Sequence, residues 1–299
     1  RTGQKLARVK MALRIDPVFI LGKNRNRRIV DKLQLGDADA VLARDYAAEM
    51  AAAIGSDIVL VELGSGSGRK TRILLEAVAP EAYLPIDISR DQLIDSANAI
   101  AHEFPHVQVH AVCADYSGES FALPPLDPLR TKRRVVYFPG STIGNFTPAE
   151  AARFLRQTAQ LAGAGGGLLI GVDLKKSASL LHAAYNDAQG VTAEFNLNLL
   201  LRINRELGAD FDLAAFEHRA FYDASAGRIE MHLRASRAQQ VKLADQIFSF
   251  AECETIHTEN SYKYDVREFT ALAVSAGWQA VKAWTDPAQL FSVHYFLAT

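Results

Sequence analysis

The chain has 299 residues, of which 49% are hydrophobic and 22% charged, a composition typical of one or two globular domains with a buried core. Its net charge of −1 at pH 7 argues against a partner bound by phosphate neutralisation, so no nucleic acid is expected. No apolar run approaches the roughly 18 residues of a membrane span, so we expect no membrane-spanning segment. The two cysteines, Cys113 and Cys253, are too few for a disulfide framework and lack metal-ligand spacing. We therefore expect a cytoplasmic protein that binds no metal ion.

The first part of the chain is basic. Residues 1–33 hold ten Lys or Arg and two Asp, and these basic residues share no helical face. That pattern favours a solvated segment over a phosphate-binding arm or a targeting remnant. The chain begins with Arg1 rather than Met, which predicts a fragment or a processed protein. We expect residues 1–41 to form a separate N-terminal segment that could belong to a substrate-binding domain.

Between residues 40 and 175, apolar strands alternate with helices. Thr147-Pro148-Ala149-Glu150 predicts a capped helix start, and Ser89 is the expected N-cap of another helix. Alternation of this kind predicts βαβ units and a parallel sheet, whose strands are buried on both faces. The expected strands are Ile58–Leu63, Tyr83–Ile88, Val107–Val112, Arg134–Phe138 and Leu168–Leu174, and the expected helices are 40–54, 70–79, 90–102 and 148–162.

The rhythm changes after residue 175. Residues 178–216 read as helices, and residues 219–258 alternate polar and apolar side chains, which is typical of an antiparallel sheet with one wet face. A helix at Asp265–Ala276 and strands at Gln279–Trp284 and Phe291–Leu297 follow. We therefore predict an α/β domain formed by residues 42–175 and 264–299, with an α+β domain, 176–263, inserted into it.

The strongest chemical signal is the glycine cluster Gly64-Ser-Gly-Ser-Gly68, which directly follows the first predicted strand. Glycine lets the backbone pass close to a ligand, and this position marks the first crossover of a nucleotide-type fold. Asp87 and Asp115 end the next two strands. Because ligands of open α/β sheets bind outside the carboxyl ends of the strands, we expect the loop and both acids to meet at one adenosine-type cofactor.

The loop leaves two classes of cofactor open. A dinucleotide oxidoreductase usually carries G-x-G-x-x-G, whereas here the third glycine comes one position early and Arg69-Lys70 follows it. Glu62-Leu-Gly-Ser-Gly66 resembles the first motif of class I methyltransferases, in which the loop faces the amino-acid part of the cofactor. The methyltransferase is favoured, and the oxidoreductase is its structural rival.

Further motifs make the resemblance specific. They span residues 41–299, occur in one order along the chain, and together resemble the L-histidine Nα-methyltransferase family of ergothioneine biosynthesis. The motifs are Gly64–Arg72, Pro85-Ile-Asp-Ile-Ser89, Gly140-Ser-Thr-Ile-Gly-Asn145, Ala184-Tyr-Asn-Asp187, Gly190-Val-Thr-Ala193, Asn204-Arg-Glu-Leu207, Arg228-Ile-Glu-Met231 and Thr258-Glu-Asn-Ser261.

The resemblance implies a Rossmann-like class I methyltransferase sheet with an inserted α+β substrate-binding domain. It also implies S-adenosyl-L-methionine as cofactor and L-histidine as the substrate, methylated to hercynine. In the cofactor site it implies roles for Gly64, Lys70, Asp87 and Asp115. In the substrate site it implies Asn145 as the catalytic residue that holds the amino and carboxylate groups, together with Tyr185, Met231, Glu259 and Ser261.

The residue types agree with parts of this assignment. Asn145 follows a strand of the sheet and offers both a donor and an acceptor, so it can meet an amine and a carboxylate. Glu259 and Ser261 are two residues apart, so an extended segment aims both at one face, and a carboxylate can recognise an imidazole. Taken alone, Tyr185 is more typical of a half-buried helix residue, and Met231 is more typical of a core residue.

One departure from the family concerns the N-terminal segment. Family members carry tyrosine-containing segments before the glycine loop, whereas the first tyrosine here is Tyr46. The alternatives are therefore a methyltransferase acting on another amino acid or an indole amine, and a cofactor-binding homologue left inactive by its altered N-terminal pocket segment. We expect a monomer with a small amino-acid substrate.

Overall fold

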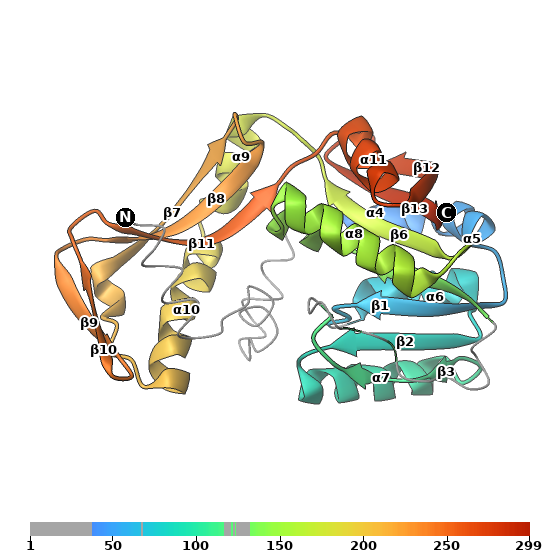
Figure 1. Ribbon diagram of the computed structural model, residues 1–299, viewed down its shortest axis with the longest axis horizontal. Coiled ribbons are helices and arrows are strands. Elements are labelled where there is room, and N and C mark those ends of the chain that lie inside the picture. The colour runs from blue at the N-terminus through green and yellow to red at the C-terminus, as the bar shows by residue number, and fades with distance from the viewer. Residues whose placement is uncertain (1–37, 67, 117–120, 122, 124–131) are drawn as a thin grey trace. The chain divides into compact units, whose positions relative to one another are not determined.

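The computed structural model describes residues 38–66, 68–116, 121, 123 and 132–299. The predicted N-terminal segment, apart from residues 38–41, lies outside the described residues. Two compact units are present: one contains Lys176–Tyr262, and the other contains the described residues up to Lys175 together with Lys263–Thr299. Each unit is considered separately below, beginning with the second, which carries the glycine loop (Figure 1).

The unit with the glycine loop is built on an eight-stranded sheet among the described residues. The strands pair in the order β12-β13-β6-β5-β1-β2-β3, with β4 also paired to β2. The neighbouring strands β3, β2, β1, β5 and β6 are parallel, and β13 and β12 add to the β6 edge as antiparallel strands. The bounds are β1 (Ile58–Leu63), β2 (Ala82–Asp87), β3 (Gln108–Val109), β4 (Val112–Cys113), β5 (Arg133–Phe138), β6 (Gly167–Asp173), β12 (Trp278–Thr285) and β13 (Phe291–Ala298).

The order of the strands creates a switch point between β1 and β5. From β1 the chain proceeds outward to β2 and β3, and then returns to β5 on the other side. The loops that leave β1 and β5 therefore diverge at the carboxyl edge of the sheet, which is where open α/β folds bind ligands. All six residues of β1 are buried, because a central parallel strand is covered on both faces.

Helices cover both faces of this sheet. On one face, a core cluster joins apolar side chains of the strands to those of α4, α5, α6 and α7. On the other face, α8 packs on β5, β6 and α11, and the indole of Trp278 donates to the carbonyl of Leu155 at 2.8 Å. The bounds are α4 (Ala38–Asp45), α5 (Ala47–Ile54), α6 (Arg69–Val78), α7 (Arg90–Glu103), α8 (Pro148–Ala162) and α11 (Val266–Ser275), with a 3-10 helix η2 (Thr142–Asn145).

The unit Lys176–Tyr262 packs two helices on an antiparallel sheet. β7, β8 and β11 form this sheet, with β8 in the centre, and β9 and β10 form a separate hairpin. Burial alternates strictly along β8, so one face of the strand is packed and the other is more open. The bounds are α9 (Ala178–Tyr185), α10 (Val191–Leu207), η3 (Leu213–Ala215), β7 (Phe216–Asp223), β8 (Arg228–Ala235), β9 (Gln239–Leu243), β10 (Gln246–Phe250) and β11 (Thr255–Tyr262).

Two predicted elements were wrong in detail. The helix expected at 40–54 is two helices that meet at Tyr46, whose backbone leaves the helical region at ψ 13° and whose ring packs against the core. The strand expected at Val107–Val112 is divided into β3 and β4, each of two residues paired with β2. Contacts of Tyr46 with the core and of β3 and β4 with β2 determine where these elements break. The local sequence pattern does not reveal such tertiary contacts.

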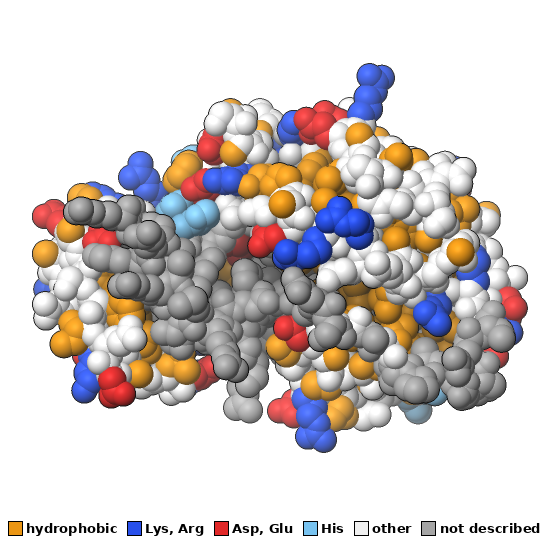
Figure 2. Space-filling model, viewed as in Figure 1, with side chains coloured by type: hydrophobic (Ala, Val, Ile, Leu, Met, Phe, Trp, Pro, Cys, Tyr) orange, Lys and Arg blue, Asp and Glu red, His pale blue; other side chains and the backbone are white. Residues whose placement is uncertain are grey.

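Other observations concern the surface. Basic and acidic side chains are interspersed on the described part of the face in Figure 2, in keeping with the near-neutral net charge. Both cysteines are free thiols on the surface. Among the described residues, none of the helices combines the length and the apolar character that crossing a bilayer requires.

Candidate functional site

The glycine loop folds over the end of β2. The backbone N–H of Gly64 donates to the carbonyl of Ile86 at 2.8 Å, and the N–H of Ser65 donates to the same carbonyl at 3.3 Å. Gly64, Gly66 and Gly68 all have left-handed backbone angles, with φ of 72°, 49° and 65°. Only glycine adopts these angles without a steric cost, so the cluster forms a tight turn from β1 into α6.

Tyr116 closes over this turn, and the sequence did not single it out. A Cβ on Gly64 would lie 3.0 Å from the hydroxyl oxygen of Tyr116, so a larger residue would require the Tyr116 side chain to shift by a few tenths of an ångström. The Tyr116 ring is buried edge-on against Phe138 and Phe154. The available signal was its place directly after Asp115, at the end of the third strand region.

Asp87 connects the glycine loop to the following helix. One carboxylate oxygen accepts the backbone N–H of Gly66 at 3.2 Å, and the other accepts the N–H of Ser89, the N-cap of α7, at 2.8 Å. A carboxylate oxygen has more than one acceptor position. Asp87 is therefore fixed in orientation beside the loop and keeps acceptor capacity for the hydroxyls of a ribose.

The other predicted residues of this unit lie on the same edge of the sheet. Lys70 is half-buried in the first turn of α6, and Asp115 is exposed after β4. Asn145 ends η2, and η2 is tied to β6 because the N–H of Asp173 donates to the hydroxyl of Ser141 at 2.8 Å. Within the described residues, the Asn145 side chain makes no hydrogen bond, so its amide is available to a ligand.

Beneath the loop, Glu62 forms a buried hydrogen-bonded centre. Its carboxyl group is 2.8 Å from the hydroxyl of Thr71 on α6 and also accepts the hydroxyl of Tyr83 on β2. Burial, aided by the negative charge of Asp87, raises the pKa of Glu62 to about 8 despite these hydrogen bonds. Glu62 is therefore largely a neutral acid at neutral pH, and it ties together the three elements that frame the turn.

In the unit Lys176–Tyr262, the structure brings the predicted substrate residues together. The hydroxyl of Tyr185, the last residue of α9, donates to the hydroxyl of Ser261 on β11 at 2.8 Å. Glu259 is paired with Met231 across β11 and β8. Met231 is buried in a cluster with Leu181 of α9, against which Tyr185 also packs. The four predicted residues thus belong to neighbouring positions of one unit.

The residues next to Tyr185 fix its place. Asn186 donates to the carbonyl of Ala220 on β7 at 3.0 Å, and the Asp187 carboxylate accepts the first backbone N–H groups of α10. Nε2 of His218 lies 2.9 Å from the Tyr185 carbonyl, and burial lowers the pKa of His218, which disfavours the charged ring. Tyr185, Asn186 and Asp187 therefore bind β11, β7 and α10 in turn, so each residue of this short motif has its own structural partner.

A β-bulge determines which way Glu259 faces. Thr258 is an extra residue between the pairs His257–His232 and Glu259–Met231. The Thr258 hydroxyl donates to the Met231 carbonyl at 3.0 Å and so holds the bulge in place. The bulge puts Glu259 and Ser261 in register with the packed side of β8, at Met231 and Ile229.

Comparison with known proteins identifies histidine methyltransferases and ergothioneine biosynthesis proteins as relatives. A family model described as a histidine-specific, SAM-dependent methyltransferase matches residues 37–298. The chain is 43% identical over 261 residues to the histidine N-alpha-methyltransferase of Mycolicibacterium smegmatis, across 85% of this chain and 79% of that protein. Identity to the enzyme of the same name from Mycobacterium tuberculosis is 41% over 262 residues, across 86% and 80%. Ergothioneine biosynthesis protein 1 of Neurospora crassa is 30% identical across 90% of this chain and 32% of that protein.

Solved structures confirm the predicted fold class. An S-adenosylmethionine-dependent methyltransferase from Clostridium acetobutylicum aligns with a TM-score of 0.53 and 11% identity, across 92% of this chain and 98% of that one. The CcbJ methyltransferase of Streptomyces caelestis aligns with a TM-score of 0.51 and 16% identity, across 88% and 98%. At these identities the likeness concerns the fold alone, which is the class I methyltransferase sheet.

The crowding at Gly64 can be tested by substitution. We expect Gly64→Ala to weaken S-adenosylmethionine binding by at least about ten-fold, because the new Cβ meets the Tyr116 hydroxyl and the left-handed angle is strained. Gly163→Ala is the matched control, since Gly163 has φ +75° with nothing within 4 Å. Calorimetric titration measures both. Adding Tyr116→Phe removes the nearest atom and should restore part of the binding; equal effects of the two glycine substitutions would contradict the crowding.

The raised pKa of Glu62 predicts a dependence of stability on pH. The folded protein keeps the Glu62 proton up to a pKa of about 8, whereas the unfolded chain loses it near 4.5. Folding stability from this group therefore falls as pH rises from 4.5 to 8, by up to about 1.4 kcal/mol per pH unit. Glu62→Gln should flatten the pH profile of the unfolding free energy measured in urea. The control Glu76→Gln, at an exposed position of α6, should keep the slope, and an unchanged slope in Glu62→Gln would refute the prediction.

Proposed function

Because the chain belongs to the family of histidine-specific, S-adenosylmethionine-dependent methyltransferases, we propose that it methylates the α-amino nitrogen of L-histidine to hercynine, the trimethylated product. The observation that carries this proposal is the 43% identity to a histidine N-alpha-methyltransferase across most of both chains. The local geometry of the predicted site residues supports it. The monomeric state and the cytoplasmic location stay predictions from the sequence.

The cofactor assignment rests on the fit of the carboxyl edge to an adenosine. Asp87 would accept the ribose hydroxyls, since both of its oxygens are already oriented by backbone N–H groups. At the turn, Gly64 lies close to the Tyr116 hydroxyl, and the turn would lie against the methionine part together with Lys70. Asp115 would accept the amine of adenine. When bound, the cofactor supplies a methyl group activated by a sulfonium.

The substrate assignment rests on the unit Lys176–Tyr262, which we propose as the substrate-binding domain. Tyr185 and Ser261 form a hydroxyl pair that can bind polar groups, with Tyr185 assigned to the carboxylate and Ser261 to the imidazole. Glu259 would accept an imidazole N–H, which is a charge-assisted hydrogen bond. Met231 would pack beside the ring. An indole would use such a carboxylate less well, because its ring cannot take up a proton and pair with the carboxylate as an imidazolium does.

The chemistry is a displacement at carbon. The cofactor, held by Asp87, Asp115, Lys70 and the Gly64 turn, would supply its sulfonium methyl group to the lone pair of the substrate amine, and the broken S–C bond would leave its electron pair on S-adenosylhomocysteine. The amine must be neutral, so its proton passes to water before each transfer. Asn145 cannot act as a base, but its amide can orient the amine, and positioning is the main contribution that a protein makes to such a reaction.

The direct test is incubation of the full chain with L-histidine and S-adenosylmethionine, followed by mass spectrometry. Successive gains of one, two and three methyl groups on the α-amine are expected, with hercynine as the final product. Tryptophan and a 4-prenylated tryptophan serve as competing substrates. Methylation of the indole amino acids alone, or cofactor binding without any turnover, would refute the proposal and support the rival substrate or the inactive homologue.

The role of Asn145 has its own test. Asn145→Ala should lower kcat/KM for histidine by about 100-fold, since misplacing a reacting group costs that much. It should leave the affinity for S-adenosylmethionine unchanged, because Asn145 is assigned to the amine. Asn98→Ala, on the exposed face of α7, is the control for the same substitution. Parallel losses of cofactor affinity and turnover, measured by calorimetry and steady-state kinetics, would contradict this role.

A further inference from the structure

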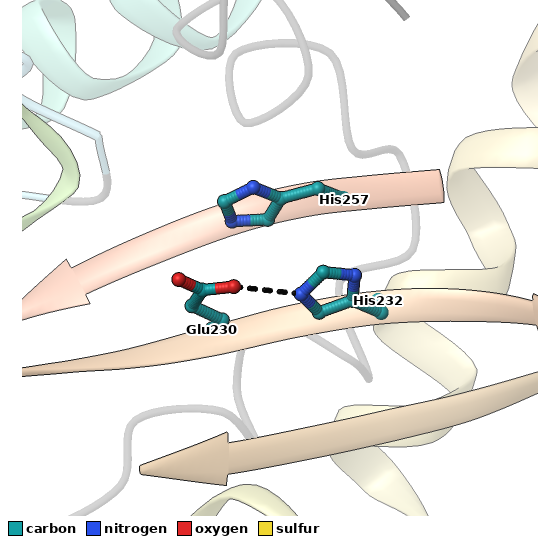
Figure 3. Close-up of side chains that lie close together, drawn as sticks. All are labelled: Glu230, His232 and His257. Atoms are coloured by element: carbon teal, nitrogen blue, oxygen red, sulfur yellow. Dashed lines mark hydrogen bonds and ion pairs between the residues drawn. The ribbon is translucent and has the colours of Figure 1, made fainter. Parts of the chain in front are cut away.

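Three side chains on β8 and β11 bring nitrogen and oxygen ligands together away from the predicted substrate residues. Glu230 and His232 are two residues apart on β8 and share one face of the strand. His257 on β11 is paired with His232 across the strands. One candidate ligand atom of each residue lies within 4.8 Å of the other two, and Figure 3 shows the carboxylate and both rings gathered at one place.

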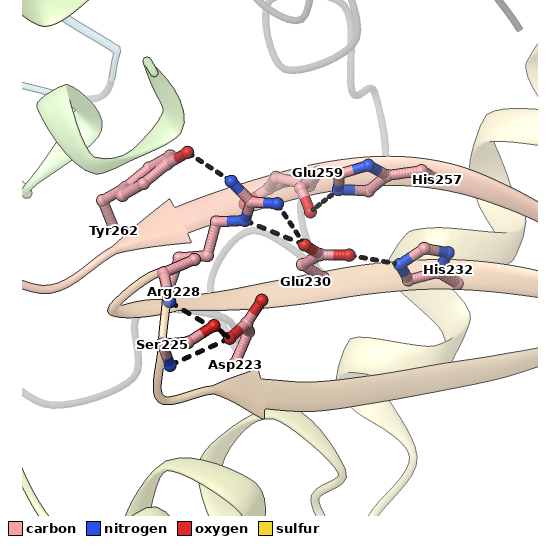
Figure 4. A network of polar contacts seen from close by, with 9 residues as sticks. Asp223, Ser225, Arg228, Glu230, His232, His257, Glu259 and Tyr262 are labelled. Atoms are coloured by element: carbon pink, nitrogen blue, oxygen red, sulfur yellow. Dashed lines mark hydrogen bonds and ion pairs between the residues drawn. The ribbon is translucent and has the colours of Figure 1, made fainter. Parts of the chain in front are cut away.

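Arg228 and His232 each contact a different oxygen of the Glu230 carboxylate. Arg228 donates through Nε to Oε1 at 2.9 Å, while Oε2 lies 2.9 Å from Nε2 of His232. Arg228 is itself anchored on the hydroxyl of Tyr262 (Figure 4). Oε2 is thereby turned toward the imidazoles, and Arg228 acts as the kind of outer partner that orients carboxylate ligands at metal sites.

Ring stacking holds both histidines in place, but their ring nitrogens have different hydrogen-bond partners. Their rings are stacked with centroids 4.6 Å apart, and Phe221 stacks on the other side of His232 at 5.3 Å. Nε2 of His257 lies 3.1 Å from the backbone carbonyl of Glu259. Nδ1 of His232 is buried without a hydrogen-bond partner among the described residues. Nε2 is the nitrogen that faces Glu230, so a metal ion would bind Nε2, and the imidazole proton would then reside on Nδ1.

We propose that Glu230, His232 and His257 bind a zinc ion that links β8 to β11. Two imidazoles and one carboxylate form a ligand set found in zinc sites that keep one open coordination position. Magnesium and calcium are disfavoured, because they require oxygen ligands. The stacked rings must tilt toward a shared point on binding. The site lies on the face of β8 opposite Met231, and its test measures metal binding, which does not rest on the proposed function.

The test uses the untagged full chain with Cys113→Ser and Cys253→Ser, because both thiols are exposed and would bind zinc themselves. Calorimetric titration with zinc chloride should show saturable binding of about one ion per chain at the highest affinity. His257→Asn and Glu230→Gln should each weaken this binding by more than about ten-fold. His110→Asn, at an exposed position of the other unit, is the control and should leave it unchanged.

A second measurement keeps the test decisive if a variant fails to fold, as judged by circular dichroism. One equivalent of Cu²⁺ on the same thiol-free protein should give an electron paramagnetic resonance spectrum with coupling to imidazole nitrogens. Absence of saturable zinc binding would overturn the proposal. Binding that folded His257→Asn does not affect, or a copper spectrum without nitrogen coupling, would also overturn it and leave the three residues as an ion-pair network alone.

Discussion

The carboxyl edge of the sheet beside the glycine loop depends on one carboxylate that accepts hydrogen bonds from two elements. Asp87 ends β2, and its oxygens accept backbone N–H groups of Gly66 in the loop after β1 and of Ser89 at the start of α7. These donors would otherwise be unsatisfied ends of a turn and of a helix. Since β1 and β2 are paired in register up to Leu63 and Ile86, the carboxylate completes a continuous frame beside the glycine loop. A ligand would meet a surface that is already fixed.

The parallel sheet could be predicted from the sequence because burial on both faces leaves a strong local trace. β1 has the predicted bounds Ile58–Leu63, and the predicted Thr147–Glu150 capping box is present at the start of α8. Elements shaped by distant contacts were less predictable. Tyr46 interrupts a helix-forming run by packing into the core, and the strand expected at Val107–Val112 follows β2 in two short pieces.

Among the candidate site residues, those marked by their position along the chain could also be predicted better than those shaped by contacts distant in sequence. Asp87 could be found from its position after a strand, and Tyr185 only through the family resemblance. Tyr116 was missed, since its approach to Gly64 arises from the packing of two loops. Glu62 was read as part of a motif, but its neutral state follows from burial beside Thr71 and Tyr83, which spacing along the chain does not reveal.

The extra residue Thr258 separates two chemistries on one pair of strands. Without a bulge, residues two apart on β11 would face the same side, so His257 and Glu259 would share a face. The bulge instead keeps His257 in register with His232 while moving Glu259 into register with Met231. The Thr258 hydroxyl bond to the Met231 carbonyl stabilises that arrangement. A cluster of imidazoles can therefore lie behind the strand whose other side carries Glu259 and Ser261, and each set keeps its own neighbours.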